Sequence, residues 1–213
     1  MVKTPVFELK NAGFLVLAAL SVSVAAASLR YALPEPPGAP VDVLANAHAI
    51  PFLAVHALFG AAALGIGPFQ FWTRLRQIRR RLHMGLGVVY AACCVIAGTA
   101  GVILAFGNTH GPIAAAGFGL LGAAWLVTTA MAVQAVARGR YHVHRRWMIR
   151  SFALTFSAVT LRLQLAVVGL ADLPFSSSYI AISFACWVPN LMAAELWIAL
   201  TARQNQPASR KGA

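Results

Sequence analysis

Six long apolar runs, separated by short polar segments, dominate this chain of 213 residues. About 20 consecutive apolar residues can cross a bilayer as a helix, because a helix satisfies its own backbone N–H and C=O groups in hydrocarbon. Hydrophobic residues make up 60% of the chain and charged residues 10%, whereas soluble domains carry roughly 25% charged residues. The sequence therefore predicts an all-α integral membrane bundle rather than a soluble domain.

The ends of the helices are expected where the apolar runs meet proline-rich, glycine-rich or basic segments. The first run also resembles a secretory signal, because small residues follow it, but its length favours an uncleaved membrane helix. We expect a single membrane domain over residues 1–213 with a disordered tail at 201–213. The six predicted membrane helices are 11–33, 49–72, 83–106, 112–137, 147–170 and 179–200.

The basic residues gather on one side of the predicted bundle. The net charge is +12, and all Lys and Arg residues except Arg30 and Arg162 fall in four segments between or beyond the apolar runs. Cytoplasmic segments of membrane proteins carry such an excess of positive charge. We therefore expect both termini in the cytoplasm and the protein in a bacterial inner membrane. The inner arginines would contact anionic lipid head groups, and a nucleic-acid partner is not expected.

Four histidines lie near the ends of the predicted helices, two on each side of the membrane. His56 and His110 belong to the outer ends of the second and fourth helices, while His83 and His144 belong to the inner ends of the third and fifth. Alternate helices of a bundle can face each other across its core, as two axial ligands of one haem require. We expect the first two to bind an outer b-type haem and the last two an inner one. Alternatively, all four are interfacial residues.

Two of these histidines have a glycine four residues later: Gly60 after His56 and Gly87 after His83. Residues four apart lie on one face of a helix, one turn from each other. A flat macrocycle bound through a histidine needs a missing side chain beside it, which favours cofactor binding at these positions. Close packing between membrane helices, which also uses glycine, is the alternative.

Arg162 lies deep in the fifth apolar run, where an unpaired charge is costly. It follows His144 by 18 residues, or five helical turns, and so lies on the same face. There it could bind a haem propionate, a quinone carbonyl or a substrate carboxylate, and Gln164 and Asn190 could hydrogen-bond the arginine itself. The alternative is a structural bridge to backbone carbonyls of the sixth helix, which Pro189 interrupts.

Glu195 is the acidic residue placed well inside a predicted helix. We expect it to form a salt bridge with an arginine at the inner end of the fifth helix rather than to relay protons. With Arg162 and Asn190 it also defines an alternative function, a non-redox transporter of small solutes or a scaffold that binds and assembles partners. The sequence contains no nucleophile–base group, phosphate loop or zinc-type spacing that would indicate an enzyme.

The chain resembles an uncharacterised family of predicted bacterial membrane proteins, known as a domain of unknown function. The resemblance covers roughly residues 50–200 and implies a multi-helix membrane fold without an established activity. It rests on five motifs: His56-x-x-x-Gly60, GPFQF (67–71), RRLHMGLGVVY (80–90), HRRWMIRSFALTFSAVTLRL (144–163) and CWVPNLMAAEL (186–196).

The order of the histidines is similar to that of cytochrome b561-like proteins. These proteins have six helices, and two haems are bound through histidines on helices 2 and 4 and on helices 3 and 5. The similarity implies the same two pairs of ligands named above. We therefore hypothesise transmembrane electron transfer through haem b, with Arg162 binding a propionate, a quinone or another small electron donor.

Overall fold

The computed structural model describes residues 5–33, 35–38 and 41–204, and every regular element in these ranges is a helix. Six segments are long and apolar enough to cross a membrane. The prediction of an all-α protein with six membrane-spanning helices is confirmed. The six segments are Ala12–Ala32, Pro51–Gln70, Arg80–Phe106, Pro112–Ala137, Tyr141–Leu170 and Phe175–Ala202.

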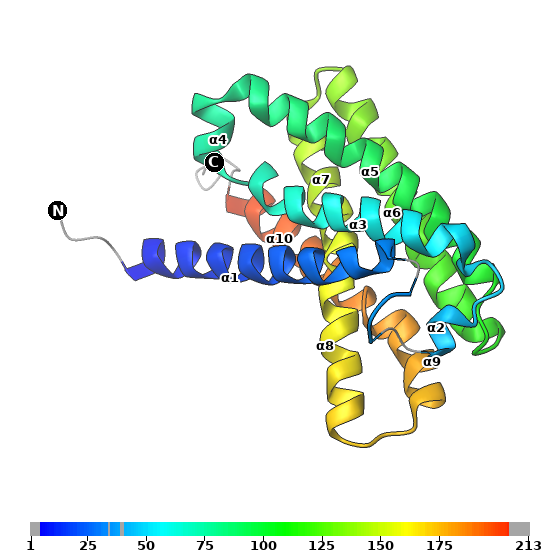
Figure 1. The fold of residues 1–213 in the computed structure, drawn as a ribbon. Helices are drawn as coiled ribbons and strands as arrows, with labels where there is room; N and C mark the ends of the chain where they lie inside the picture. The colour runs from blue at the N-terminus through cyan, green and yellow to red at the C-terminus, as the bar shows by residue number, and fades with distance from the viewer. Residues whose placement is uncertain (1–4, 34, 39–40, 205–213) are drawn as a thin grey trace, which may run out of the picture.

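Figure 1 shows how these segments are built from the individual helices. Two short helices lie in connections, α2 (Val41–Leu44) in the proline-rich loop and α4 (Thr73–Ile78) in the basic segment. The long helices are α1 (Pro5–Ser28, continued by the 3₁₀ turn η1, Leu29–Ala32), α3 (Ala49–Gln70), α5 (Arg80–Phe106), α6 (Pro112–Ala137), α7 (Tyr141–Thr155), α8 (Ser157–Leu170), α9 (Phe175–Ala185) and α10 (Val188–Gln204).

Four helices begin earlier than the sequence predicts: α1 at Pro5 rather than at residue 11, α5 at Arg80 rather than at residue 83, and the helices that start the fifth and sixth segments. The fifth segment starts at Tyr141 rather than at residue 147, since arginines are good helix formers and extend the helix into the interface. The sixth starts at Phe175 rather than at residue 179, and its first turn is held by ring contacts to His110. The expected tail, 201–213, is helical as far as Gln204, and residues 205–213 lie outside the described ranges.

The sixth segment is broken at Cys186 and Trp187, just before Pro189. Proline lacks an N–H and cannot continue the preceding helix. The carbonyl of Cys186 accepts hydrogen bonds from Thr160 Oγ1 (2.8 Å) and Asn190 Nδ2 (3.1 Å). A broken helix is tolerated at membrane depth when side chains satisfy its freed backbone groups in this way.

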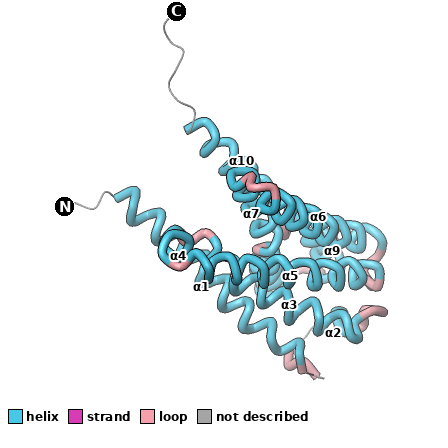
Figure 2. The backbone as a smooth tube through the Cα atoms, turned by 90° about the horizontal axis from the view of Figure 1, so that it is seen from above, coloured by secondary structure: helices cyan, strands magenta, loops and turns pink. Residues whose placement is uncertain are grey.

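Neighbouring helices pack in chain order through α3, α5, α6 and α7, with α1 on α3, α9 on α6 and α10 on α7. Figure 2 shows α1 beside α3 at one side of the bundle and α10 beside α7 at the other. The main core contains Tyr90, Trp125 and Phe152. Gly67 on α3 allows the ring of Phe152 to approach, because an added Cβ would overlap that ring. The bundle is therefore tightly packed at its centre.

Large apolar side chains cover the outside of the bundle. Val88, Phe106 and Leu170, for example, are exposed by 71%, 81% and 90% of their surfaces. Exposed apolar patches of this kind are costly in water but match the hydrocarbon of a bilayer. The exterior therefore supports the membrane assignment independently of helix length.

Candidate functional site

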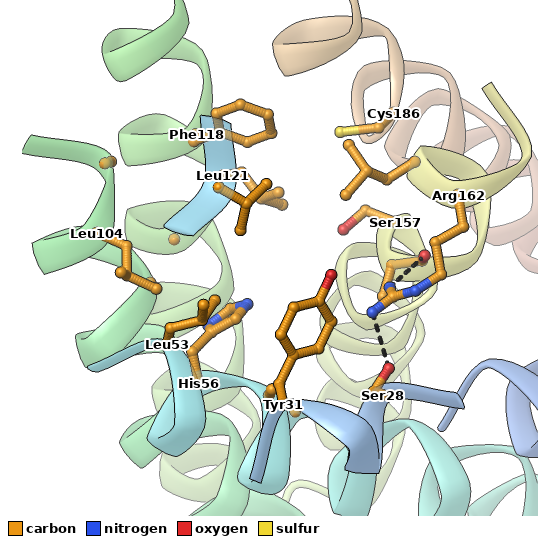
Figure 3. A pocket seen from close by; sticks show the side chains of 18 of the residues that line it. Ser28, Tyr31, Leu53, His56, Leu104, Phe118, Leu121, Ser157, Arg162 and Cys186 are labelled. Atoms are coloured by element: carbon orange, nitrogen blue, oxygen red, sulfur yellow. Dashed lines mark hydrogen bonds between the residues drawn. The ribbon is translucent and has the colours of Figure 1, made fainter. Parts of the chain in front are cut away.

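A cavity of about 600 Å³ opens between the helices near Arg162, the half of the bundle predicted to be outer. Its wall contains residues from α1, η1, α3, α5, α6, α8 and α9. Figure 3 shows His56 on one side and Arg162 on the other, with the Tyr31 ring projecting between them. Cofactor and ligand pockets commonly have volumes of about 300–1,000 Å³, so this cavity is large enough for such a molecule.

His56 reaches the cavity from α3 with one ring nitrogen already engaged. Its Nδ1 lies 2.9 Å from the carbonyl oxygen of Ala97 on α5 and must donate to it, because a carbonyl only accepts. Nε2 then carries the lone pair, as in metal-bound histidines whose other nitrogen donates to a backbone carbonyl. Gly101 makes room for the ring, since an added Cβ would lie 3.0 Å from it. Gly60, one turn after His56, also lines the cavity.

Arg162 lines the same cavity from α8. Its guanidinium donates to the carbonyl of Ala158 (2.9 Å) and to Ser28 Oγ at the end of α1 (2.8 Å), as the dashed lines in Figure 3 show. It also lies close enough to His56 for the two side chains to interact electrostatically. The hydrogen-bond acceptors of Arg162 are therefore neutral groups of α8 and α1.

Two expected neighbours of Arg162 have other partners, so those predictions were wrong. Gln164 donates to the carbonyl of Ala185 (3.1 Å), and Asn190 donates to Thr160 Oγ1 (2.8 Å) at the helix break. The structural bridge expected from Arg162 to the sixth helix is made by these residues instead. The difference arises because the arginine side chain extends toward α1, whose position the sequence does not reveal.

His110 lines the cavity as well, from the loop between α5 and α6. Its ring packs against Tyr179 (centroids 4.6 Å apart) and Phe175 (5.5 Å) at the start of α9. Its Nδ1 lies 3.4 Å from Ser176 Oγ. The structure thus brings His110 and His56 to the same cavity, with His110 in an aromatic cluster at the rim.

His144 is anchored in the inner half by the same kind of contact as His56. Its Nδ1 lies 2.9 Å from the carbonyl oxygen of Ala132 on α6. His83, in the first turn of α5, is near enough to His144 to interact electrostatically, and its buried Nδ1 has no hydrogen-bond partner. Gly87 faces the Gln70 side chain, whose Oε1 lies 3.4 Å from the position of an added Cβ. No hydrogen bond or ring contact joins His83 to His144 among the described residues, and Gln70 lies beside Gly87.

A cluster of buried hydroxyl groups lies between the two histidine sites. Tyr90 Oη is 3.0 Å from Ser151 Oγ and 2.8 Å from Thr155 Oγ1, and Ser151 Oγ is 2.8 Å from Thr129 Oγ1. Thr155 also lines the outer cavity. Sequence reasoning missed this cluster, although Tyr90 and Ser151 follow His83 and His144 by seven residues, or about two turns.

Glu195 forms the expected salt bridge. Both of its carboxylate oxygens accept from Arg150, with Nη2 2.8 Å from Oε2, and the Arg150 guanidinium also lies 4.6 Å from the centre of the Trp147 ring. Arg162, Asn190 and Glu195 therefore each have separate partners. The alternative polar site that would combine these three residues is not assembled.

Four further side chains of the cavity wall were missed by sequence reasoning. Ser28, Arg30 and Tyr31 come from the end of the first membrane segment. The fourth, Trp125, is buried, and its indole N–H has no partner. The polar residues ending an otherwise apolar run were the available signal.

A family model described as a predicted membrane protein (DUF2306) matches residues 53–198, which agrees with the resemblance seen in the sequence. No curated protein and no solved structure matches the chain. The matched range extends from α3 into α10 and includes all four predicted haem ligands and Arg162, whereas α1 and η1 precede it. The likeness to cytochrome b561-like proteins stays a prediction.

Proposed function

This chain belongs to the DUF2306 family of predicted membrane proteins, and we propose that it carries electrons across the membrane through b-type haem. The observation that carries the proposal is the orientation of the His56 ring. Its Nδ1 is fixed on the Ala97 carbonyl, which leaves Nε2 as a ligand atom in the wall of a cavity of about 600 Å³. His110 in the same wall is the proposed second ligand, and Arg162 the proposed partner of an anionic group.

The residues of the outer cavity fit a haem in donor chemistry as well as in space. In the described part of the chain, no group of three or more His, Cys, Asp or Glu side chains is arranged to hold a metal ion. A haem needs only one or two side-chain ligands, because the macrocycle supplies the others. When bound, haem supplies one-electron redox chemistry. The chain orients the ring of His56 and places a positive charge at Arg162 in the cavity wall.

The proposed inner site uses His83 and His144. The contact of His144 Nδ1 with the Ala132 carbonyl supports it, because it leaves Nε2 as the ligand atom in the same manner as at His56. The proximity of His83 is the second supporting observation. The aromatic and hydroxyl cluster around Tyr90 lies between the two proposed sites.

We propose that the basic face of the bundle is cytoplasmic and that the membrane is the bacterial inner membrane. Arg74, Arg76 and Arg79, in or beside α4, are exposed. Exposed arginines at a membrane surface attract anionic lipid head groups, and the positive-inside bias orients such segments toward the cytoplasm. The electron donor would then meet the cavity from the outer side, with a quinone or a small molecule as the donor class.

The test is a reduced-minus-oxidised absorption spectrum of the purified full chain, with a haem assay per chain. We expect a b-type spectrum and a content near two haems. His56→Ala should remove the outer signal and His144→Ala the inner one. His48→Ala and His142→Ala are matched controls at the outer and inner ends, and they should keep both signals. A chain without haem from cells supplied with haem precursor contradicts the proposal.

The non-redox alternative has less support. Its three polar residues have separate structural partners, so no common solute site links them. If the cavity served a transported solute, replacing Arg162 would abolish function while replacing His56 and His110 would not. A haem-free protein with that pattern of mutant effects would establish the alternative.

A further inference from the structure

The cavity wall on the side of α1 holds two arginines. Arg162 from α8 and Arg30 from η1 both line it, and Arg162 donates to Ser28, two residues before Arg30. The Arg30 guanidinium lies 5.2 Å from the centre of the Tyr31 ring, with Nη2 3.5 Å from the Tyr31 hydroxyl. The Nε of Arg30 is buried and has no hydrogen-bond partner. Two cations therefore share one end of the cavity.

No carboxylate balances these two charges in the described part of the chain. Arg162 donates to a backbone carbonyl and to the Ser28 hydroxyl. The salt bridge found in the described ranges joins Arg150 to Glu195, on other helices. Like charges repel strongly in a medium of low dielectric constant, and an arginine at membrane depth is retained where a partner compensates it. An anionic ligand, rather than any described side chain, is the partner that would balance both charges.

The remainder of the cavity indicates what kind of anion fits. Its wall is largely formed by apolar residues such as Leu53, Leu104 and Phe118, several of which Figure 3 shows around the open space. The indole N–H of Trp125, a residue exposed by only 6%, has no partner and remains available to an acceptor. A ligand for this cavity therefore has a large apolar body and anionic groups at one end.

We infer that Arg162 and Arg30 form a clamp for the two carboxylates of an amphiphilic ligand, and that the end of the first membrane segment closes the site over them. This inference rests on the proposed function, in which the ligand is haem b and the carboxylates are its propionates. It adds a direction to that function: the carboxylate edge of the macrocycle faces α1 and η1, and its apolar edge faces α5 and α6.

Half of the clamp comes from outside the region that the family model matches. The match begins at residue 53, whereas Ser28, Arg30 and Tyr31 belong to α1 and η1. Ser28 also links the two halves, because its hydroxyl accepts from Arg162 and itself donates to the carbonyl of Val24 (2.7 Å). The first membrane segment is therefore part of the binding site and not only an anchor.

The test uses metal-free protoporphyrin IX and its dimethyl ester on the detergent-purified full chain, with binding followed by porphyrin fluorescence. Without iron, histidine ligation contributes nothing, so the carboxylates are tested alone. We expect the acid to bind about tenfold or more tightly than the ester, since a charge-assisted hydrogen bond is worth about 1.5–3 kcal/mol. Arg30→Gln and Arg162→Gln should each weaken acid binding about tenfold and leave ester binding unchanged.

The controls separate this inference from the proposed function. His56→Ala should lose haem but keep porphyrin binding, and Arg74→Gln, at an exposed arginine of α4, should change neither. Binding of the ester shows that each variant is folded. If Arg162→Gln fails to fold, Arg162→Lys and Arg30→Gln are used to test the clamp instead. Equal binding of acid and ester, or arginine variants that bind the acid normally, overturns the clamp even if haem is present. Selective acid binding by a chain that takes up no haem supports the clamp and rejects haem as its ligand.

Discussion

His56 in the outer half of the bundle and His144 in the inner half are anchored alike. In each, Nδ1 lies 2.9 Å from a backbone carbonyl of an adjacent helix, Ala97 on α5 for His56 and Ala132 on α6 for His144. Their surroundings differ. His56 borders a cavity of about 600 Å³ whose two arginines have no carboxylate partner in the described ranges. In the inner half, Arg150 of α7 is paired with Glu195, and the smaller cavity there, of about 110 Å³, is lined by His142, Arg145 and Arg146.

The different surroundings of the two histidines distinguish two requirements of a ligand site: orienting the histidine ring and selecting the ligand. Orienting a histidine ring requires one backbone carbonyl, which both halves supply, and in the outer half Gly101 also makes room for the ring. Selecting a ligand requires unsatisfied charge and open space, and the outer half has both. If both halves bind ligands as we propose, we expect ligand selectivity to be concentrated in the outer half, which has the larger cavity.

Among single substitutions, we expect the largest effect on the difference in haem binding between the two halves at Gly101. An added Cβ would lie 3.0 Å from the His56 ring, so Gly101→Leu should displace that ring from Ala97. We expect loss of the outer haem signal, retention of the inner signal, and a decrease of about 1–3 kcal/mol in unfolding free energy from overpacking.

The measurement is haem content with the absorption spectrum of the purified variant. Gly85→Leu is the matched control on the same helix, because an added Cβ there meets no atom within 4 Å. If both variants bind haem equally, His56 is not held in the way described and the contrast between the halves is lost.

A smaller effect is expected at Tyr90, between the two sites. Tyr90→Phe removes the hydroxyl, yet Ser151 retains Thr129 as a partner and Thr155 retains the Ser151 carbonyl. We therefore expect a decrease of about 1 kcal/mol in unfolding free energy, in keeping with single hydrogen bonds in membrane proteins. Thr99→Val is the control, since that exposed hydroxyl donates only to its own helix. Unfolding by SDS titration measures both, and a loss above about 3 kcal/mol would show that the cluster acts as a unit.

The smallest effect is expected from Glu195→Gln in the inner half. The Glu195 side chain is 50% exposed, and exposed ion pairs contribute about 0–1 kcal/mol. The unfolding free energy should therefore change by less than at Tyr90, and the haem spectrum should not change. Arg150→Gln, which removes the other partner, should give a similar small loss. A large loss of inner haem in either variant would assign the pair to the inner site and remove the asymmetry between the halves.

The sequence predicts most of the fold because each helix must supply its own apolar run to cross the bilayer. It also predicts the interruption of the sixth helix near Pro189, but not its partners, because the freed Cys186 carbonyl is met by Thr160 and Asn190 only in the folded bundle. The early start at Tyr141 was missed for a related reason. Arginine-rich turns resemble loops by hydropathy even where they are helical.

Part of the candidate site is also predictable from the apolar runs. His56 and Arg162 stand out as polar residues inside apolar runs. Their neighbours do not, because Ser28 and Arg30 end another run and reach the cavity only through the packing of α1 against α3 and α8. Hydroxyl residues such as Ser151 commonly bond their own helix backbone, so nothing in the sequence marks the cluster around Tyr90.

The position of α1 has a consequence for how a ligand arrives. The end of α1 and the turn η1 line the cavity, and α1 packs against both α3 and α8. Displacement of that single element would open a side entrance within the bilayer. An oily molecule already dissolved in the membrane would then load without crossing water, and its supply would follow its partitioning into lipid rather than its aqueous concentration.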